Sequence, residues 1–214
     1  MNRLENTEEF WNGVVNNFTH KGGDQWLHRH IAEVSEGKSL SIFDIGCGHG
    51  LETDFMLRAG HEVLSADYSQ AMLDKMHATV PGSKGIKFDM EKGDWSQFKE
   101  NQFDVVVASL SLQYFDGKTT VRIINEIKRV LRPGGKLLAR VNSVNDIGHG
   151  AGDGELVEEN FYIDRTRGIP KRYFNADSVQ RFFAPLGKLS FQEMQSIYNN
   201  SPKVVFEIVV VNGK

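Results

Sequence analysis

Three glycines stand at alternate positions after the first apolar run of the chain: Gly46, Gly48 and Gly50, in the segment FDIGCGHG. Alternate glycines let the backbone bend sharply and approach a ligand closely. The helix expected to follow offers free N–H groups and a positive dipole end, which favour an anionic group. The third glycine comes too early for the phosphate pattern G-x-G-x-x-G, and no lysine follows. The loop therefore favours a carboxylate ligand over a pyrophosphate; the alternative is a plain strand–helix turn.

Acidic residues follow the next two expected strands. Asp67 lies 21 residues beyond Gly46, where nucleotide-binding folds place a carboxylate that accepts hydrogen bonds from ribose hydroxyls. The alternative is that Asp67 or Ser69 only caps the next helix. Asp89 can accept a hydrogen bond from an exocyclic amine, and the backbone N–H of Met90 can donate one to a purine ring. For Asp89 the alternative is an ordinary turn aspartate.

A glycine-rich segment after the fifth expected strand, residues 142–154, supplies the candidates for proton transfer. His149 lies among alternating glycines, and Asp146 precedes it by three residues. Both types of side chain act as general bases in enzymes, so His149 and Asp146 are the candidate catalytic residues. The alternative is a solvated mobile loop without a catalytic group.

Aromatic side chains are the candidates for an acceptor pocket: Trp11, Trp26, Tyr114 and Tyr173. The first two belong to a pair of expected N-terminal helices, which would fold over the site. We therefore expect an N-terminal helical lid of residues 1–36 and one globular unit of residues 37–214. Ordinary core packing is the alternative for each aromatic residue.

The composition excludes several classes of protein. The 214 residues include one cysteine, so an internal disulfide and a multi-thiolate zinc site are ruled out. His28 and His30 are two apart on an expected helix and face different directions, so we expect no metal site. The net charge of −3 does not attract nucleic acid. With no basic–apolar leader and no apolar stretch of about 18 residues, we expect no membrane partner and a cytoplasmic location.

These residues must be positioned by a regular alternation of elements. Strands are expected at 40–45, 62–66, 85–89, 103–109 and 136–142, with helices between them and a further helix around Val179. Two more extended runs, 189–198 and 203–211, indicate an antiparallel hairpin. Near the N-terminus, Gly22 and Gly23 are expected to separate two helices and Asp24 to cap the second. The pattern predicts an α/β, doubly wound, mostly parallel seven-stranded sheet, which binds ligands at the carboxyl ends of its strands.

The ordered segments FDIGCGHG, SADYS, KFDM, FDVVVASLSLQYF and LRPGGKLLARVNS resemble the class I S-adenosylmethionine-dependent methyltransferases over residues 40–143. The resemblance implies a Rossmann-like methyltransferase fold, S-adenosyl-L-methionine as cofactor and S-adenosyl-L-homocysteine as product. It also implies the cofactor-binding residues Asp44, Gly46, Cys47, Gly48, Gly50, Asp67, Tyr68, Asp89, Met90, Ser109, Leu110 and Ser111. A narrower resemblance is to small bacterial methyltransferases of the tellurite-resistance type.

The segment after the fourth expected strand narrows the classes of methyl acceptor that the chain can have. The only cysteine, Cys47, lies in the glycine loop, so a cysteine-dependent carbon-5 methylation of nucleic acid is excluded. Residues 109–112 read SLSL instead of the Asn/Asp-Pro-Pro-aromatic motif of enzymes that methylate amino groups of nucleic acids. We therefore expect a small-molecule acceptor. Two alternatives remain: an NAD(P)-dependent oxidoreductase, since Tyr114 and Lys118 match a Tyr-x-x-x-Lys pair, and a non-catalytic S-adenosylmethionine-binding protein.

Overall fold

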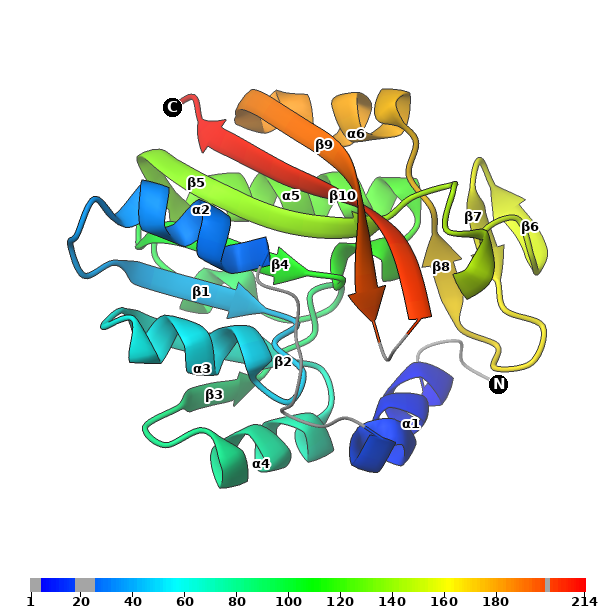
Figure 1. Cartoon of the computed structure of the whole chain (residues 1–214), viewed down its shortest axis with the longest axis horizontal. Coiled ribbons are helices and arrows are strands. Elements are labelled where there is room, and N and C mark those ends of the chain that lie inside the picture. Colours follow the sequence, from blue (N-terminus) through cyan, green and yellow to red (C-terminus); the bar gives the residue numbers. More distant parts are fainter. Residues whose placement is uncertain (1–4, 18–25, 199–200) are drawn as a thin grey trace.

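The computed structural model describes residues 5–17, 26–198 and 201–214. At its centre is a seven-stranded sheet in the order β3-β2-β1-β4-β5-β10-β9 (Figure 1). Its strands are β1 (Ser41–Ile45), β2 (Glu62–Asp67), β3 (Lys84–Lys87), β4 (Phe103–Ser109), β5 (Leu131–Asn142), β9 (Gly187–Tyr198) and β10 (Ser201–Asn212). The first five are mutually parallel, and β10 is antiparallel to both of its neighbours. The predicted sheet and its antiparallel C-terminal hairpin are confirmed.

Helices cover both faces of this sheet (Figure 1). They are α2 (Trp26–Ser35), α3 (Leu51–Arg58) and α4 (Gln70–Thr79) on one face, and α5 (Gly117–Val130) and α6 (Ala176–Phe183) on the other. Strand β4 shows why its sequence is apolar throughout. Val105 and Val107 pack in the cluster that contains Trp26 of α2, whereas Val106 and Ala108 pack in the cluster formed with α5 and α6. Both faces of this central strand are buried, as predicted.

The turn between α5 and β5 differs from the prediction in its boundaries. The helix ends at Val130, and Leu131 already pairs with Phe103 of β4. The register shifts between Phe103 and Val105, opposite the turn in which Gly134 has a φ of +72°. Strand β5 therefore begins before residue 136, because Leu131 joins the sheet ahead of the glycine turn.

A second sheet, which the sequence analysis did not predict, lies between β5 and α6 in the chain. Its strands β6 (Glu155–Glu158), β7 (Phe161–Ile163) and β8 (Pro170–Arg172) are antiparallel. The buried guanidinium of Arg172 ties them to the main body, since it donates to Glu158 at 2.8 Å and lies against the rings of Phe161 and Phe182. Strands of three or four residues are too short to show a period of two in the sequence.

The two N-terminal helices pack in different places. They are α1 (Glu5–Val14), which continues into the short helix η1 (Val15–Asn17), and α2. The first packs beside α4, whereas the second lies on the sheet with Trp26 only 1% exposed. The predicted break and cap at residues 22–24 lie outside the described residues. The division into a lid of residues 1–36 and a unit of residues 37–214 stays a prediction.

Candidate active site

The glycine loop after β1 is a tight turn with left-handed backbone. Gly46, Gly48 and Gly50 have φ values of +75°, +54° and +86°, a region that residues with side chains rarely adopt. A Cβ on Gly46 would lie 2.3 Å from Cβ of Ser111, and one on Gly50 would lie 2.4 Å from Cγ of Met76. A Cβ on Gly48 would meet no atom of the described residues within 4 Å. The loop is therefore packed on two sides and open at Gly48, as a ligand cradle must be.

The carboxylate of Asp67 lies directly beside this loop. Its Oδ2 accepts from the backbone N–H of Gly48 at 2.8 Å, and its Oδ1 accepts from that of Ser69 at 2.8 Å. Burial raises the pKa of Asp67, while the N–H groups of Ser69 and Gly48 oppose that rise. The cap of α4 is Ser69, whose Oγ accepts from Met72 N at 3.2 Å. The side chain of Asp67 therefore does not cap α4, and its carboxylate stabilises the glycine loop through the N–H of Gly48.

The end of β4 closes against the same loop. Ser111 Oγ donates to the carbonyl of Ile45 at 2.8 Å. Leu110 has a φ of +54°, a strained value for a residue with a branched side chain. Ser109 Oγ accepts from Nη2 of Arg140 at 3.0 Å. The carboxyl ends of β1, β4 and β5 are therefore joined by side chains at one edge of the sheet.

The segment after β3 meets the loop from the other side. Met90 Cε would lie 3.4 Å from a Cβ on Gly46, and the Met90 carbonyl accepts from Nε1 of Trp95 at 3.1 Å. Asp89 Oδ1 accepts from the backbone N–H of Glu91 at 2.7 Å. Asp89 thus has the geometry of a turn aspartate, and its second carboxylate oxygen, Oδ2, takes no part in the hydrogen bond of the turn.

Three other predicted cofactor residues differ in their exposure. Asp44 is 1% exposed and Oδ2 accepts from Thr53 Oγ1 at 2.7 Å. Burial, with a smaller contribution from Glu52, raises the pKa of Asp44 to about 8. Cys47 is also buried, and burial raises the pKa of its thiol well above the ordinary value. Tyr68 is half-buried beside Asp67. The side chains of Asp44 and Cys47 are therefore buried in the interior, whereas that of Tyr68 is partly exposed.

The two candidate catalytic residues are hydrogen-bonded to each other. Nδ1 of His149, in the short helix η4 (Ile147–His149), lies 2.9 Å from Oδ1 of Asp146. Asp146 is 1% exposed, and it also accepts from Lys203 Nζ and from the backbone N–H of Val204, each at 3.0 Å. Burial opposes ionisation of Asp146, but Val204, Lys203 and His149 outweigh it and hold the pKa below its usual value. Asp146 is thus an ionised acceptor that orients the imidazole.

The predicted pocket aromatics fall into two groups. Trp11 and Tyr114 form an edge-on pair with ring centroids 5.5 Å apart, and both are half-buried. Tyr173 is 3% exposed and donates from its hydroxyl to the carbonyl of His149 at 2.7 Å. Trp26 is a core residue, with Nε1 donating to Glu52 and Arg140 lying over its ring. Of these four side chains, only Trp11 and Tyr114 are partly exposed.

The elements that carry these residues meet at one end of the molecule. In Figure 1, α1 and the sheet β6–β8 lie toward the same end as the carboxyl ends of β1 and β4. Strand β8 packs against η3 (Leu112–Tyr114), and the guanidinium of Arg167 lies 5.9 Å from the ring of Phe10 in α1. The elements that carry the cofactor candidates and the aromatic pair therefore lie toward one end of the molecule, although separate segments of the chain supply them.

Sequence reasoning missed the cations of this region: Arg140, Lys171 and Lys203. The signal available for Arg140 is a charge inside an otherwise apolar strand, LLARVN, which indicates a paired buried group. Lys203 carries no comparable signal, because its partner Asp146 is 57 positions away. Lys171 belongs to the small sheet that was not predicted.

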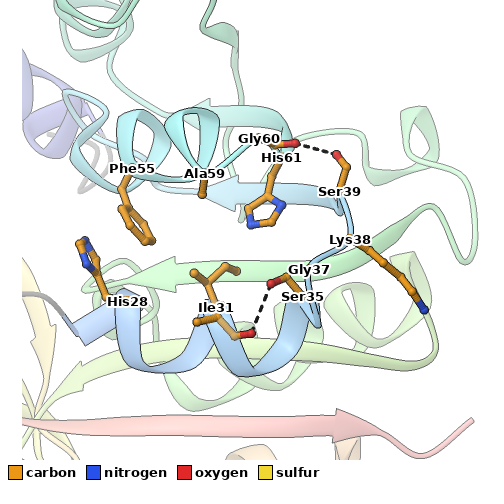
Figure 2. A pocket seen from close by; sticks show the side chains of 11 residues that line it. His28, Ile31, Ser35, Gly37, Lys38, Ser39, Phe55, Ala59, Gly60 and His61 are labelled. Atoms are coloured by element: carbon orange, nitrogen blue, oxygen red, sulfur yellow. Dashed lines mark hydrogen bonds between the residues drawn. The ribbon is translucent and has the colours of Figure 1, made fainter.

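A surface hollow elsewhere in the fold contains none of the predicted site residues. It has a volume of about 440 Å³ and lies between α2 and α3. Figure 2 shows its lining, with His28 and Phe55 at one side and His61, Ser39 and Lys38 at the other. Ser39 lies two residues before β1 and His61 directly before β2, so the hollow opens at the amino edge of the sheet, opposite the glycine loop.

The described residues, 5–17, 26–198 and 201–214, also bear on metal binding and on membrane spanning. Among those residues, no group of three or more His, Cys, Asp or Glu side chains is arranged to hold a metal ion. No helix in the same residues has the length and apolar character needed to cross a membrane.

Comparison with known proteins shows that the chain is similar to methyltransferases. Residues 43–139 match the family model described as a methyltransferase domain. A magnesium-protoporphyrin O-methyltransferase of Rhodobacter capsulatus is 33% identical over 86 residues, 40% of this chain and 38% of that protein. A demethylmenaquinone methyltransferase of Lactococcus lactis is 26% identical over 146 residues, 63% of this chain and 57% of that protein. The chain thus spans roughly half the length, or less, of these relatives.

A solved S-adenosylmethionine-dependent methyltransferase from Methanosarcina mazei shares the fold, with a TM-score of 0.71 and 19% identity over 89% of this chain and 98% of the other. The fold is therefore that of solved S-adenosylmethionine-dependent methyltransferases, and residues 43–139 are similar to a methyltransferase domain. The narrower resemblance to the tellurite-resistance type gains no support from these relatives and stays a prediction.

Proposed function

We propose that this chain transfers the methyl group of S-adenosylmethionine to a small-molecule acceptor. The observation that carries the proposal is the open glycine loop beside the carboxylate of Asp67, at an end of the molecule toward which α1 and the sheet β6–β8 also lie (Figure 1). The acceptor would lie between that cradle and the aromatic pair of Trp11 and Tyr114, which are 5.5 Å apart. The net charge of −3 favours a small molecule over nucleic acid.

The residues at the cradle fit the cofactor chemically. The N-terminal end of α3 suits a carboxylate, because a helix presents its positive end there and the cap residue Gly50 supplies no side-chain hydrogen bond. Asp67 has the acceptor oxygens that ribose hydroxyls need. Asp89 and Met90 would face the adenine, with one carboxylate oxygen and one backbone N–H. Bound there, S-adenosylmethionine supplies a methyl group on a positively charged sulfur, and the electron pair of the broken bond stays on that sulfur.

His149 would act as the general base. Because its Nδ1 is hydrogen-bonded to the ionised Asp146 at 2.9 Å, the lone pair lies on Nε2, which would take the proton of the acceptor. Tyr173 holds the carbonyl of the same residue at 2.7 Å, so both ends of His149 are fixed. Because the imidazole is already held in place, its conformational entropy need not be lost when the reaction takes place.

Helix α1 would act as a cover over this site. Ser69 Oγ donates to Asn12 at 2.6 Å, Lys75 Nζ donates to the carbonyl of Val15 at 2.7 Å, and Lys87 pairs with Glu8. These contacts come from α4 and from the end of β3, on either side of Asp67. A cover held in this way would exclude water from the transfer. The prediction of an N-terminal lid is therefore retained for α1.

The oxidoreductase alternative lacks a matching geometry. Tyr114 lies in η3 and Lys118 in α5, and Asp116 caps that helix between them by accepting from Thr119 N at 2.7 Å. The two side chains therefore do not share one helix face, as a catalytic Tyr-x-x-x-Lys pair requires.

The buried single thiol of Cys47 supports the further proposal of a cytoplasmic location.

The test combines cofactor binding with turnover. Calorimetry with S-adenosylhomocysteine should show binding, and an assay of homocysteine released from a panel of phenols, enols, amines and thiols should show turnover. His149→Gln should lower kcat about 10²- to 10⁴-fold and leave the Kd for S-adenosylhomocysteine unchanged. His77→Gln, at an exposed position of α4, is the matched control. Absence of binding overturns the proposal, and binding without turnover favours the non-catalytic alternative.

A further inference from the structure

The ammonium group of Lys171 lies beside His149 without a carboxylate partner. Its Nζ donates to the carbonyl of His149 at 3.1 Å and lies 4.9 Å from the ring centroid of Tyr173. Among the side chains that the structure describes, none supplies Lys171 with an ion pair within 4.0 Å. An ammonium has three donors, and one carbonyl uses only one of them. Two charged donors therefore remain available in a half-buried place.

The nearest carboxylates are committed elsewhere. Asp146 binds Lys203 and His149, and Asp164 accepts from the backbone N–H groups of Thr166 and Arg167. Burial is the largest cause that lowers the pKa of Lys171, to about 8; the positive charges of Lys203 and Arg167 add to it, while the negative charges of Asp146 and Asp164 oppose it. A cation in such surroundings gains most from an anion that a ligand brings.

Lys171 also lies where an acceptor must come. It shares the carbonyl of His149 with the hydroxyl of Tyr173, so it is a direct neighbour of the proposed base. Its strand β8 packs against η3, and η3 carries Tyr114, the partner of Trp11. A planar ring lying against these aromatic side chains would thus have an acidic substituent within reach of Lys171.

We propose that Lys171 is a specificity-determining residue that binds an anionic oxygen on the acceptor, which is a planar aromatic compound bearing a carboxylate or an ionised hydroxyl. This inference rests on the proposed function for the identity of the site. The two oxygen groups share one chemistry, since both accept a charge-assisted hydrogen bond from an ammonium. They differ in whether the anion only anchors the ring, so that His149 takes the proton of another group that is methylated, or is itself the methylated oxygen, in which case His149 takes the hydroxyl proton as that oxygen ionises.

The probes are benzoate and benzamide, which have nearly the same shape and differ in charge. Their Kd values are measured by ligand-observed NMR, with and without saturating S-adenosylhomocysteine, on native protein, Lys171→Met and Lys171→Arg. Benzoate should bind native protein about 10- to 150-fold more tightly than benzamide, the range of one charge-assisted hydrogen bond. The ratio should fall to about one in Lys171→Met and persist in Lys171→Arg. The control, Lys38→Met, removes an exposed charge at the opposite edge of the sheet and should keep the native ratio.

The outcomes separate this inference from the proposed function. Equal binding of the two probes, no binding of benzoate, or a ratio that survives in Lys171→Met overturns the role of Lys171. Failure of S-adenosylhomocysteine to bind overturns the proposed function, while the ratios of probe Kd values measured without it still test whether Lys171 binds an anion.

A second pair of probes, 4-nitrophenolate and nitrobenzene, tests whether the anionic oxygen of the acceptor is the methylated atom or only the anchor. Formation of methyl 4-nitrophenyl ether identifies the ionised oxygen as the methylated atom, and binding without methylation identifies it as the anchor.

Discussion

The buried carboxyl of Asp44 should make the protein less stable as the pH rises through the neutral range. Burial raises its pKa from the ordinary value of 3.8 to about 8. The folded protein then keeps a proton that the unfolded chain has lost, so this contribution to stability is complete below pH 3.8 and is lost progressively up to about pH 8. One proton corresponds to about 1.4 kcal/mol for each pH unit. Between pH 5 and pH 7 the free energy of unfolding should therefore fall by about 2–3 kcal/mol from this group alone.

Asp44→Asn removes the titration and keeps an oxygen for the Thr53 hydroxyl, which lies 2.7 Å from Asp44 Oδ2. Urea unfolding at several pH values should show that the native protein loses about 2–3 kcal/mol more than the variant between pH 5 and pH 7. Asp74→Asn, which removes an exposed carboxylate of α4, is the control and should keep the native dependence. Parallel curves for native protein and Asp44→Asn would refute the reasoning, since they would mean that Asp44 is ionised when folded.

Two further changes test the cradle. Asp67→Ala removes the proposed acceptor of the ribose hydroxyls, so the Kd for S-adenosylhomocysteine measured by calorimetry should rise about 10- to 150-fold for each charge-assisted hydrogen bond lost; an unchanged Kd would place the ribose elsewhere. Gly46→Ala combines a φ of +75° with a contact 2.3 Å from Cβ of Ser111, and it should cost more stability in urea unfolding than Gly60→Ala. The latter, with a φ of +86° and no described atom within 4 Å, should cost only about 1–2 kcal/mol. Equal losses would show that the contact with Ser111 is not tight.

The class of fold followed from local patterns in the chain. A run such as FDVVVAS is apolar on both faces because a central strand is covered by helices on both sides, and the structure buries Val105 and Val106 in opposite clusters. The spacing of the glycines predicted the tight turn after β1, because only glycine adopts the φ values found at Gly46 and Gly50 without strain. These features depend on neighbours in the sequence, so the sequence alone indicates them.

The alternatives at Asp67 and Trp26 could be resolved only by three-dimensional contacts. The sequence allowed either Asp67 or Ser69 to cap the next helix, and the structure assigns the cap to Ser69. It also allowed Trp26 to face either a pocket or the core, and its exposure of 1% places it in the core. An aromatic residue on an amphipathic helix has the same pattern in both cases, so the packing of α2 decides its surroundings.

The sequence by itself determined the alternation of strands and helices, the glycine loop and the acidic residues at the strand ends, because these are local and periodic. The tertiary structure decided which of them act together. The pairing of Asp146 with Lys203 spans 57 positions, and the approach of Lys171 to His149 spans 22. Contacts over such separations depend on how the β9–β10 hairpin and the small sheet pack beside η4, and no short stretch of sequence carries that information.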